Sequence, residues 1–286
     1  MWCGGRDLNP GHRLGRALNL NELWNLHQRQ FSEWLSGQVS NSTAKDYLSV
    51  LNRFFGRYKI SSFEDLRKAL NAENYKRNLA KALRNFVKYL YLHDVISFEL
   101  YEKFKAIIKI KKAGASRTFI TDEELREAYG YFKKHGRREE LILFKLLLFS
   151  GLRLTHAIKV LNEFDRKKLT VLGNIAKYEL FTHEGTKLAY YAYMPKELAE
   201  ELFKSDYSYD MAKKYLRYGR VTAKSIRKWF ATFLIKQNVP PSVINYIQGR
   251  VPQKVLDAYY AELENLADEA YSRVVDELKK VLEGSE

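Results

Sequence analysis

Residues 141–156 read LILFKLLLFSGLRLTH, an apolar run that leads through Ser150 and Gly151 to Arg153. The run contains Lys145 and is far shorter than the roughly 20 residues that cross a bilayer, so it predicts a buried helix. An arginine directly after a buried helix needs a partner or serves a site, because an uncompensated buried charge is destabilising. Arg153 is therefore the first candidate functional residue, and a surface arginine at a helix end is the alternative.

The charge of the chain is strongly positive and unevenly distributed. Its 286 residues carry 49 Lys and Arg against 34 Asp and Glu; residues 1–118 and 119–261 have net charges of +11 and +9, whereas residues 262–286 have −5. Both main parts are therefore suited to a polyanion such as double-stranded DNA, and a merely soluble basic protein is the alternative. The 46% of hydrophobic residues can fill one large core or two ordinary ones.

Composition also excludes several classes of protein. Cys3 is the single cysteine, which excludes an internal disulfide framework, and the six histidines are too scattered for a zinc pattern. Because neither a secretory signal nor a membrane span is visible, we expect a cytoplasmic protein with no metal and no membrane partner. Many tyrosines, lysines and glutamates, with few cysteines and methionines, favour a thermophilic source.

The first part of the chain predicts an arm followed by a helical domain. Residues 1–18 are rich in Gly and Arg and lack periodicity, which indicates a flexible basic arm. Residues 19–109 predict a helical array, and the small and basic residues at 110–118 suit a linker between domains. Helices are expected at about 21–37, from Ser42 to Gly56, after a capping box of Ser61 and Glu64, at 72–92 and at 97–110.

The helix expected at 72–92 has two different faces. At 100° per residue its apolar side chains fall within roughly an 80° arc, and its cations lie opposite. Four cations without an interspersed acid favour a DNA-facing surface, and a solvated basic face is the alternative. The apolar side chains are Tyr75, Leu79, Leu83, Phe86 and Leu90; the candidate DNA-binding residues, including two in the linker, are Arg77, Lys81, Arg84, Lys88, Lys111 and Lys112.

The second part, residues 119–286, predicts helices around one small sheet. A capping box of Thr121 and Glu124 begins it. The C-terminal helix at 262–283 carries an apolar stripe that could dock on its own subunit or on a neighbour. Strands are expected at 169–172, 176–182 and 187–194, and further helices at 197–204, 222–237, 242–248 and 253–260. The stripe consists of Leu263, Leu266, Ala270, Val274, Leu278 and Val281.

Four short motifs follow one another along this second part. They are Gly-Leu-Arg at 151–153, Lys-Ser-Ile-Arg at 224–227, Gln-Gly-Arg at 248–250 and Tyr-Tyr at 259–260. In this order they resemble the catalytic motifs of the tyrosine recombinase, or phage integrase, family, and the Lys-x-x-Arg and Gly-Arg forms resemble archaeal virus and plasmid integrases. The resemblance implies a mainly α fold: a helical core-binding domain at 19–109, and a catalytic domain at 119–286 that is mostly helical with a small antiparallel β-sheet.

The resemblance also implies an activity, namely site-specific cleavage and rejoining of DNA through a 3′-phosphotyrosyl intermediate without a cofactor. Guanidinium groups suit this chemistry because they hold the nonbridging oxygens of a phosphodiester. Topoisomerase activity of type IB alone and a noncatalytic, recombinase-derived DNA-binding protein are the alternatives. The implied catalytic residues are Arg153, Lys187, Lys224, Arg227, Arg250 and Tyr260, with Tyr259 as the alternative nucleophile.

Three of these assignments leave alternatives open. Archaeal relatives place the nucleophile ten residues after the arginine of the Gly-Arg motif, which selects Tyr260, whereas the bacterial spacing of nine selects Tyr259. Lys187, just after the turn between two strands, is the candidate general acid, and Lys177 is second. Lysine and arginine replace the usual histidines and accept protons poorly, so His156 is either a substitute base or a structural histidine.

The resemblance further implies an assembly and a target. One active site cuts one strand, so recombination implies four protomers on a DNA synapse, with a monomer or dimer in free solution. Integrases of archaeal mobile elements often carry their attachment site within their own gene. Residues 6–11 are compatible with a coding sequence whose reverse complement resembles a tRNA T-arm, which favours a tRNA gene as the target; a Gly/Arg tail without special meaning is the alternative.

Overall fold

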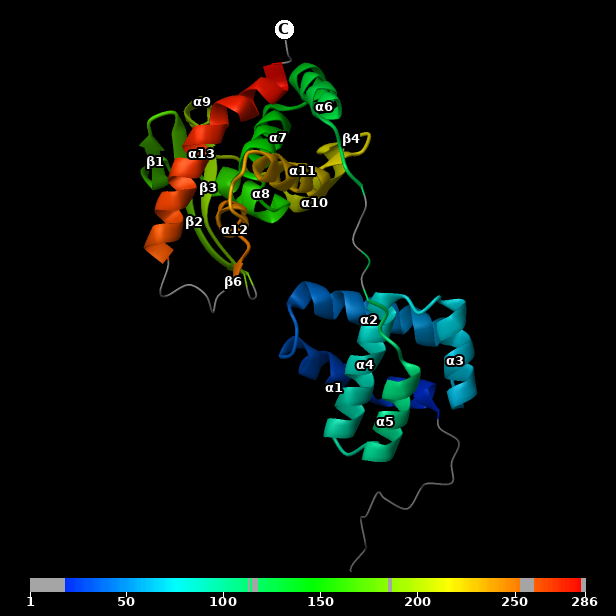
Figure 1. Ribbon diagram of the computed structural model, residues 1–286. Helices are drawn as coiled ribbons and strands as arrows, with labels where there is room; N and C mark the ends of the chain where they lie inside the picture. The colour runs from blue at the N-terminus through cyan, green and yellow to red at the C-terminus, as the bar shows by residue number, and fades with distance from the viewer. Residues whose placement is uncertain (1–18, 113, 115–117, 185–186, 253–259, 284–286) are drawn as a thin grey trace, which may run out of the picture. The chain divides into compact units, whose positions relative to one another are not determined.

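The computed structural model describes residues 19–112, 114, 118–184, 187–252 and 260–283. The chain divides into two compact units, residues 1–115 and 116–286 (Figure 1). Both units are mainly helical, and the strands of the described residues form small antiparallel sheets in the second unit, which confirms the predicted fold class. The arm predicted at 1–18 lies outside the described residues. None of the described helices is long and apolar enough to cross a bilayer.

The first unit is built around an aromatic core. The ring of Trp24 stacks on Phe55 at 5.4 Å between centroids and meets Phe86 edge-on at 5.1 Å. The side chain of Asn21 donates hydrogen bonds of 2.9 Å to the carbonyl oxygens of Phe55 and Tyr58, which ties the first helix to the end of the second. The helices are α1 (Leu20–Ser36), α2 (Asn41–Arg57), α3 (Phe63–Ala72), α4 (Arg77–Leu92) and α5 (Phe98–Ile107).

Helix α4 is shorter than predicted, because the chain turns before it. Asn74 and Tyr75 have φ angles of 50° and 47°, in the left-handed region that breaks a helix. The prediction of one helix over 72–92 is therefore wrong in its first turn, and Tyr75 does not belong to the apolar face of α4. The rest of that face is buried as predicted, and consists of Leu79, Leu83, Phe86 and Leu90.

Two helix starts differ from their predicted positions by one or two residues. Ser62, not Ser61, caps α3, and its hydroxyl accepts a hydrogen bond of 3.1 Å from the backbone N–H of Asp65. Ser61 instead donates to the Asp65 carboxylate at 2.9 Å. Ser40 caps α2 in place of Ser42. Neighbouring serines compete for the same role, so local sequence indicates the cap only to within a residue or two.

The second unit is organised around α7, whose apolar run is buried as predicted. This helix packs against α6, α8, α9, α11 and strand β3. The capping box of Thr121 and Glu124 begins α6 as predicted. The elements are α6 (Asp122–His135), α7 (Arg138–Ser150), α8 (Leu154–Asn162), η2 (Arg166–Lys168), β1 (Leu169–Leu172), β2 (Ile175–Glu184), β3 (Lys187–Pro195), α9 (Lys196–Glu201), α10 (Tyr209–Tyr215), β4 (Arg217–Tyr218), β5 (Val221–Thr222), α11 (Ala223–Lys236), α12 (Pro241–Ile247), β6 (Val251–Pro252) and α13 (Tyr260–Glu283).

The larger sheet brings distant segments side by side. Its order is β1-β2-β3-β6, and all neighbours are antiparallel (Figure 1). Lys187 pairs with Glu184 in β2 and with Pro252 in β6. The end of the β2–β3 hairpin therefore lies beside the segment that follows Arg250. The sequence did not predict α10, the β4–β5 hairpin or β6, because such short elements carry no periodic signal.

Helix α13 packs on the core of its own unit, in line with one of the two docking alternatives. The hydroxyl of Tyr271, which is fully buried, donates a hydrogen bond of 2.8 Å to the carbonyl oxygen of Phe149 in α7. Leu266 is 44% exposed, so its inclusion in the packing stripe was wrong. The buried residues of the helix are Ala267, Ala270, Tyr271, Val274, Val275, Leu278 and Val281.

A polar clamp holds the first turns of α13 to the sheet. Lys177 of β2 donates hydrogen bonds of 2.6 Å to Glu264 and to Asp268. Tyr193 of β3 donates to the other oxygen of Asp268 at 2.7 Å. Burial alone would lower the pKa of Lys177, but the hydrogen bonds and negative charges of Asp268 and Glu264 outweigh it and raise the pKa. The lysine is therefore charged, and it forms ion pairs with two acids of the same unit.

Replacing Lys177 by methionine should lower the free energy of unfolding of the second unit by about 3 kcal/mol, because two partly buried carboxylates would lose their shared cation. Urea unfolding followed by circular dichroism measures the change. The matched control is Lys280→Met, which removes an exposed pair with Glu277 and should change the free energy by at most about 0.5 kcal/mol. Equal effects of the two substitutions would contradict the clamp.

Candidate active site

The chain leaves the core through a left-handed turn at Gly151, two residues before Arg153. Helix α7 ends at Gly151, which has a φ of 58°, and a Cβ atom there would clash with the side chains of Phe230 and Gln248. The chain turns sharply at this glycine, and Arg153 becomes the N-cap residue of α8. Its Nη1 donates a hydrogen bond of 2.5 Å to the carbonyl oxygen of Gly249. Only glycine fits position 151, so the glycine of the Gly-Leu-Arg motif allows the turn that positions Arg153.

Arg227 is more deeply buried than Arg153, with 8% of its surface exposed. Its Nη1 donates to the carbonyl oxygens of Gly151 at 2.7 Å and of Gln248 at 2.8 Å. The buried amide of Gln248 returns a bond of 2.8 Å to the Arg227 carbonyl oxygen. One guanidinium group thereby joins the end of α7 to the end of α12.

The capping of α11 places Lys224 and Arg227 at different depths. Thr222 accepts a hydrogen bond of 3.2 Å from the Ser225 N–H, and Ser225 accepts one of 2.8 Å from the Thr222 N–H. This box confirms the prediction that Thr222 caps the helix. Lys224 is exposed in the first turn, and Arg227 is buried three residues later.

Arg250 depends on a close approach between a loop and the sheet. Gly249 has a φ of 62°, and a Cβ atom there would clash with Ala189 of β3. The Arg250 N–H donates to the carbonyl oxygen of Asn245 at 2.7 Å. A glycine before Arg250 therefore allows the half-buried arginine to follow α12 directly and lie against the hairpin.

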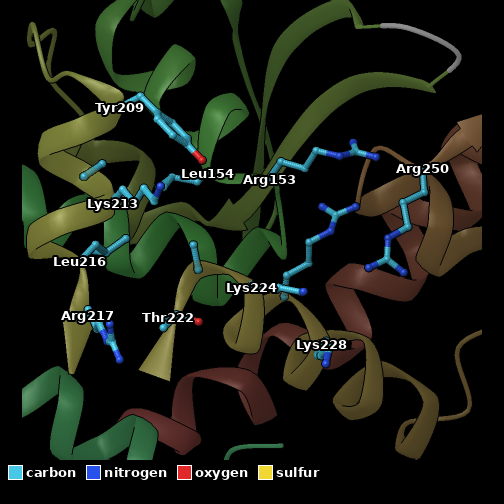
Figure 2. Close-up of a pocket in the computed structure, with 13 residues that line it drawn as sticks. Arg153, Leu154, Tyr209, Lys213, Leu216, Arg217, Thr222, Lys224, Lys228 and Arg250 are labelled. Carbon is cyan, nitrogen blue, oxygen red and sulfur yellow. The ribbon is translucent and has the colours of Figure 1, made fainter. Parts of the chain in front are cut away.

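Arg153, Lys224, Arg227 and Arg250 line one cavity of about 680 Å³. Figure 2 shows the side chains of Arg153 and Arg250 reaching into the same space from different elements, with Lys224 beside them. None of the described residues that line the cavity is an Asp or a Glu. The structure therefore gathers side chains from three separate motifs into one cationic site.

The positive charges in this cavity destabilise one another. Burial, then the charges of Arg250 and Arg153, lowers the pKa of Arg227 to about 9, and burial and Arg153 lower that of Arg250. Arg227 stays protonated at neutral pH, and its buried Nη2 has no hydrogen-bond partner within the described parts of the chain. An oxyanion with several oxygens would accept this hydrogen bond and relieve the repulsion, so the site is suited to a phosphate group.

A family model described as archaeal phage integrase matches residues 117–277. The chain belongs to the archaeal phage integrase family. This confirms the resemblance to archaeal members of the tyrosine recombinases. No curated protein matches the chain.

Solved structures of recombinases are similar to this integrase over most of its length. A crystal structure of XerA recombinase has 15% identity and a TM-score of 0.36, covering 88% of this chain and 98% of that one. XerH recombinase bound to its difH substrate before cleavage has 14% identity and a TM-score of 0.41, covering 87% and 93%. The integrase from mycobacterium phage Brujita has 12% identity and a TM-score of 0.40, covering 91% and 98%. The family is shown by the match to the family model and not by these structural similarities.

His156 of the integrase is buried next to the arginine cluster. Only 1% of its surface is exposed, and burial, together with the charges of Arg153, Arg227 and Lys159, lowers its pKa to about 4. The imidazole is therefore neutral at neutral pH and is a weak proton acceptor. This favours the structural alternative over the substitute base.

The two lysine candidates for the general acid have different surroundings. Lys187 begins β3, and its backbone lies beside Pro252, two residues after Arg250. Lys177 is held by Glu264 and Asp268, and its raised pKa makes it a poorer proton donor. These surroundings favour Lys187 over Lys177.

The two tyrosine candidates lie at the start of α13. Tyr260 is the first residue of this helix, one turn before Glu264 of the clamp. Tyr259, and all but the last residue of the helix predicted at 253–260, lie outside the described residues. The assignment of Tyr260 therefore stays a prediction.

The cations predicted to bind DNA in the first unit have different environments. Arg77 and Lys88 on α4 are exposed, and so is Lys112. Lys81 and Arg84 are half-buried, and Arg84 donates a hydrogen bond of 2.9 Å to the carbonyl oxygen of Ile108. Lys111 donates to the side-chain oxygen of Asn74 at 2.7 Å. Arg84 and Lys111 therefore have intramolecular partners in addition to any contact with DNA.

Sequence reasoning missed one wall of the cavity. Lys213 of α10, Arg217 of β4 and Lys228 of α11 line it together with the predicted cations. It also missed Gln248, whose backbone and side chain both bond Arg227. The Lys213-Lys214 pair was the available signal, but no motif or periodic pattern marked it.

Inorganic phosphate at ten times its dissociation constant should stabilise the second unit by about 1.4 kcal/mol, which raises its melting temperature by about 3 °C. The reason is that phosphate binds the folded site and relieves its repulsion. Calorimetry at constant ionic strength measures the shift. Arg250→Ala should lose most of it, whereas Arg126→Ala, which removes a partly exposed arginine paired with Glu123 outside the cavity, should keep it. Equal shifts in the two variants would show that the site does not hold the anion.

Proposed function

We propose that the protein is a site-specific DNA recombinase that integrates a mobile element by cleaving and rejoining strands through a 3′-phosphotyrosyl intermediate. The observation that carries the proposal is the gathering of Arg153, Arg227, Arg250 and Lys224 around one cavity that no carboxylate lines within the described parts of the chain. Family membership agrees with it. A scissile phosphodiester bears one negative charge that grows in the transition state, and this cavity offers fixed positive charge there.

The cleavage step is a transfer of the phosphoryl group to a tyrosine. The phenol oxygen of Tyr260 attacks phosphorus, the bond to the 5′ oxygen breaks, and a 3′-phosphotyrosyl ester forms. Near pH 7 only about one free phenol in a thousand is ionised. Neighbouring cations make the loss of the phenol proton easier. The new ester conserves the energy of the broken bond, so an incoming 5′ hydroxyl can reverse the step and join a different strand.

The guanidinium groups differ in what they can offer to the phosphate. Nη1 of Arg227 is committed to two backbone carbonyls, so Nη2 is the donor that remains for a nonbridging oxygen. Arg153 commits its Nη1 to Gly249 and has further N–H groups for the same phosphate. The backbone bonds hold both side chains in place before DNA arrives, which reduces the reorganisation that binding requires.

Lys187 is the proposed general acid for the departing 5′ oxygen. Pairing of β3 with β6 sets its backbone beside the segment that carries Arg250. An ammonium group near the 5′ oxygen would give its proton as the bond to phosphorus breaks.

The first unit is proposed to bind DNA through Arg77, Lys81 and Lys88 on α4, with Lys112 of the linker, and four protomers would form the synapse. The net charges of +11 and +9 for residues 1–118 and 119–261 agree with a clamp of two basic parts. A tRNA gene is the proposed target. Codons for residues 6–11 that do not reproduce a T-arm would remove this part of the proposal.

Tyr260→Phe should abolish the covalent complex with a nicked suicide duplex that carries the T-arm sequence, because phenylalanine has no oxygen to attack phosphorus. Tyr259→Phe is the matched control and should still form the complex, which denaturing electrophoresis detects. The opposite result would assign the nucleophile to Tyr259.

The same assay separates the recombinase from its two rivals. Covalent complexes with little preference for site, and relaxation without joining of two duplexes, would indicate a topoisomerase of type IB. DNA binding by the wild-type protein without any covalent complex would indicate a noncatalytic binding protein. Recombination between two specific sites supports the proposal.

Lys187→Ala should slow cleavage by about 10²-fold to 10⁴-fold, the usual contribution of a general acid. A 5′-phosphorothiolate at the scissile position should restore the rate, because a thiolate leaves without a proton. Single-turnover cleavage measures both substrates. Arg153→Ala serves as control and should gain nothing from the sulfur, since its role is at the nonbridging oxygens. Failure of the sulfur to rescue Lys187→Ala would point to another acid.

A further inference from the structure

The cavity of the candidate active site extends well beyond its arginines. Helix α10 and strand β4 form a second wall, which contributes Lys213 and Arg217. Figure 2 shows these two side chains, with Tyr209, on the side of the cavity opposite Arg250. Lys224 of α11 lies between the two ends. The same space is therefore lined by cations at both ends.

The second wall carries positive charge that no acid in the described parts of the chain neutralises. Seven cationic residues and no acidic one are among those described as lining the cavity. Other cations of this unit have partners: Arg220 pairs with Glu124 at 2.8 Å, and Lys145 with Glu201 at 2.7 Å. Within the described residues, neither Lys213 nor Arg217 forms an ion pair. The seven cationic residues are Arg153, Lys213, Arg217, Lys224, Arg227, Lys228 and Arg250.

The cationic surface continues past this wall. A neighbouring cavity of about 360 Å³ shares Arg217, Thr222, Lys224 and Lys228 with the first one. The shared residues make the two hollows one path along the start of α11. An extended polyanion would follow such a path, whereas a single phosphate ion would occupy only one end.

A DNA strand presents many closely spaced phosphates to such a cationic path. One strand carries a phosphate every 3.4 Å or so of helix axis. A strand whose scissile phosphate lies at Arg153, Arg227 and Arg250 therefore brings neighbouring phosphates along the path. Mutual repulsion among the cations that line the cavity is unfavourable in the free protein, and binding of several phosphates would relieve it along the whole cavity.

We infer that Lys213 and Arg217 form a second phosphate site, which binds a backbone phosphate next to the scissile one on the cleaved strand. The inference rests on the proposed function for the identity of the polyanion. The two residues hold the strand at a second point, so the scissile phosphate keeps its register against the arginines. They are positioning residues, because the phosphate they bind does not react.

Binding measurements test this site without requiring cleavage. At about 0.1 M salt, the double variant Lys213→Ala/Arg217→Ala should bind a duplex about tenfold to a hundredfold more weakly than the wild type. The slope of log K against log salt should fall by about 0.9 for each lost contact. The matched control is Lys214→Ala, since Lys214 lies over the ring of Tyr215 at 4.8 Å and does not line the cavity. It should bind like the wild type.

Neutral methylphosphonate linkages identify the phosphate. Each linkage near the scissile position is replaced in turn, and binding is measured for the wild type and for the double variant. One linkage beside the scissile phosphate should weaken the wild type but have little effect on the double variant. Identical sensitivity profiles would overturn the inference, as would a double variant that loses sequence discrimination with an unchanged salt slope, which indicates a contact to a base edge.

The outcomes separate this inference from the proposed function. Both proteins are first shown to have the same circular dichroism spectrum and melting temperature. If the wild type forms no covalent complex but the methylphosphonate pattern holds, the second phosphate site stands and the recombinase proposal fails. If covalent complexes form and the pattern is absent, the recombinase proposal stands and the second phosphate site fails.

Discussion

The structure of the site depends on the buried guanidinium group of Arg227. Its bonds to the Gly151 and Gln248 carbonyls join two chain segments that are about a hundred residues apart in sequence. Both bonds come from one terminal nitrogen, Nη1, so they depend on the length of the arginine side chain. The guanidinium group that lines the cavity thus also holds together the segments around it, so a substitution of Arg227 changes both the charge and the shape of the cavity.

In the second unit, the described residues that line the cavity include cations but no acids, whereas ion pairs between acids and cations occur elsewhere in the unit. Glu264 and Asp268, the acids that neutralise the buried Lys177, do not line the cavity. Among the described residues, no Asp or Glu lines the cavity, and burial, together with the charges of Arg250 and Arg153, lowers the pKa of Arg227. Burial of apolar surface elsewhere in the unit, including helix α7 and the buried face of α13, offsets the repulsion at the site.

The sequence predicted the elements with strong periodicity and the residues with a motif. The apolar run of α7 was found because it is continuous, the strands around Lys177 because they are rich in β-branched and aromatic residues, and the three arginines because their order matches a known set. The role of Gln248 could not be predicted, since it depends on hydrogen bonds to backbone groups that only the fold brings near. The turn at Asn74 and Tyr75 was missed because two residues of backbone conformation outweighed a good helical pattern. Lys213 and Arg217 lie on elements too short to have a period.

The docking of α13 limits which part of the chain could be exchanged between two copies of the protein. From Ala267 onward the helix fills the core of its own unit, with Tyr271 bonded to α7. A subunit that lent this helix to a neighbour would open its own interior to water, and the clamp at Lys177 would lose both of its acids. In any assembly of the chain, exchange of a segment between protomers would thus be limited to residues ahead of Ala267.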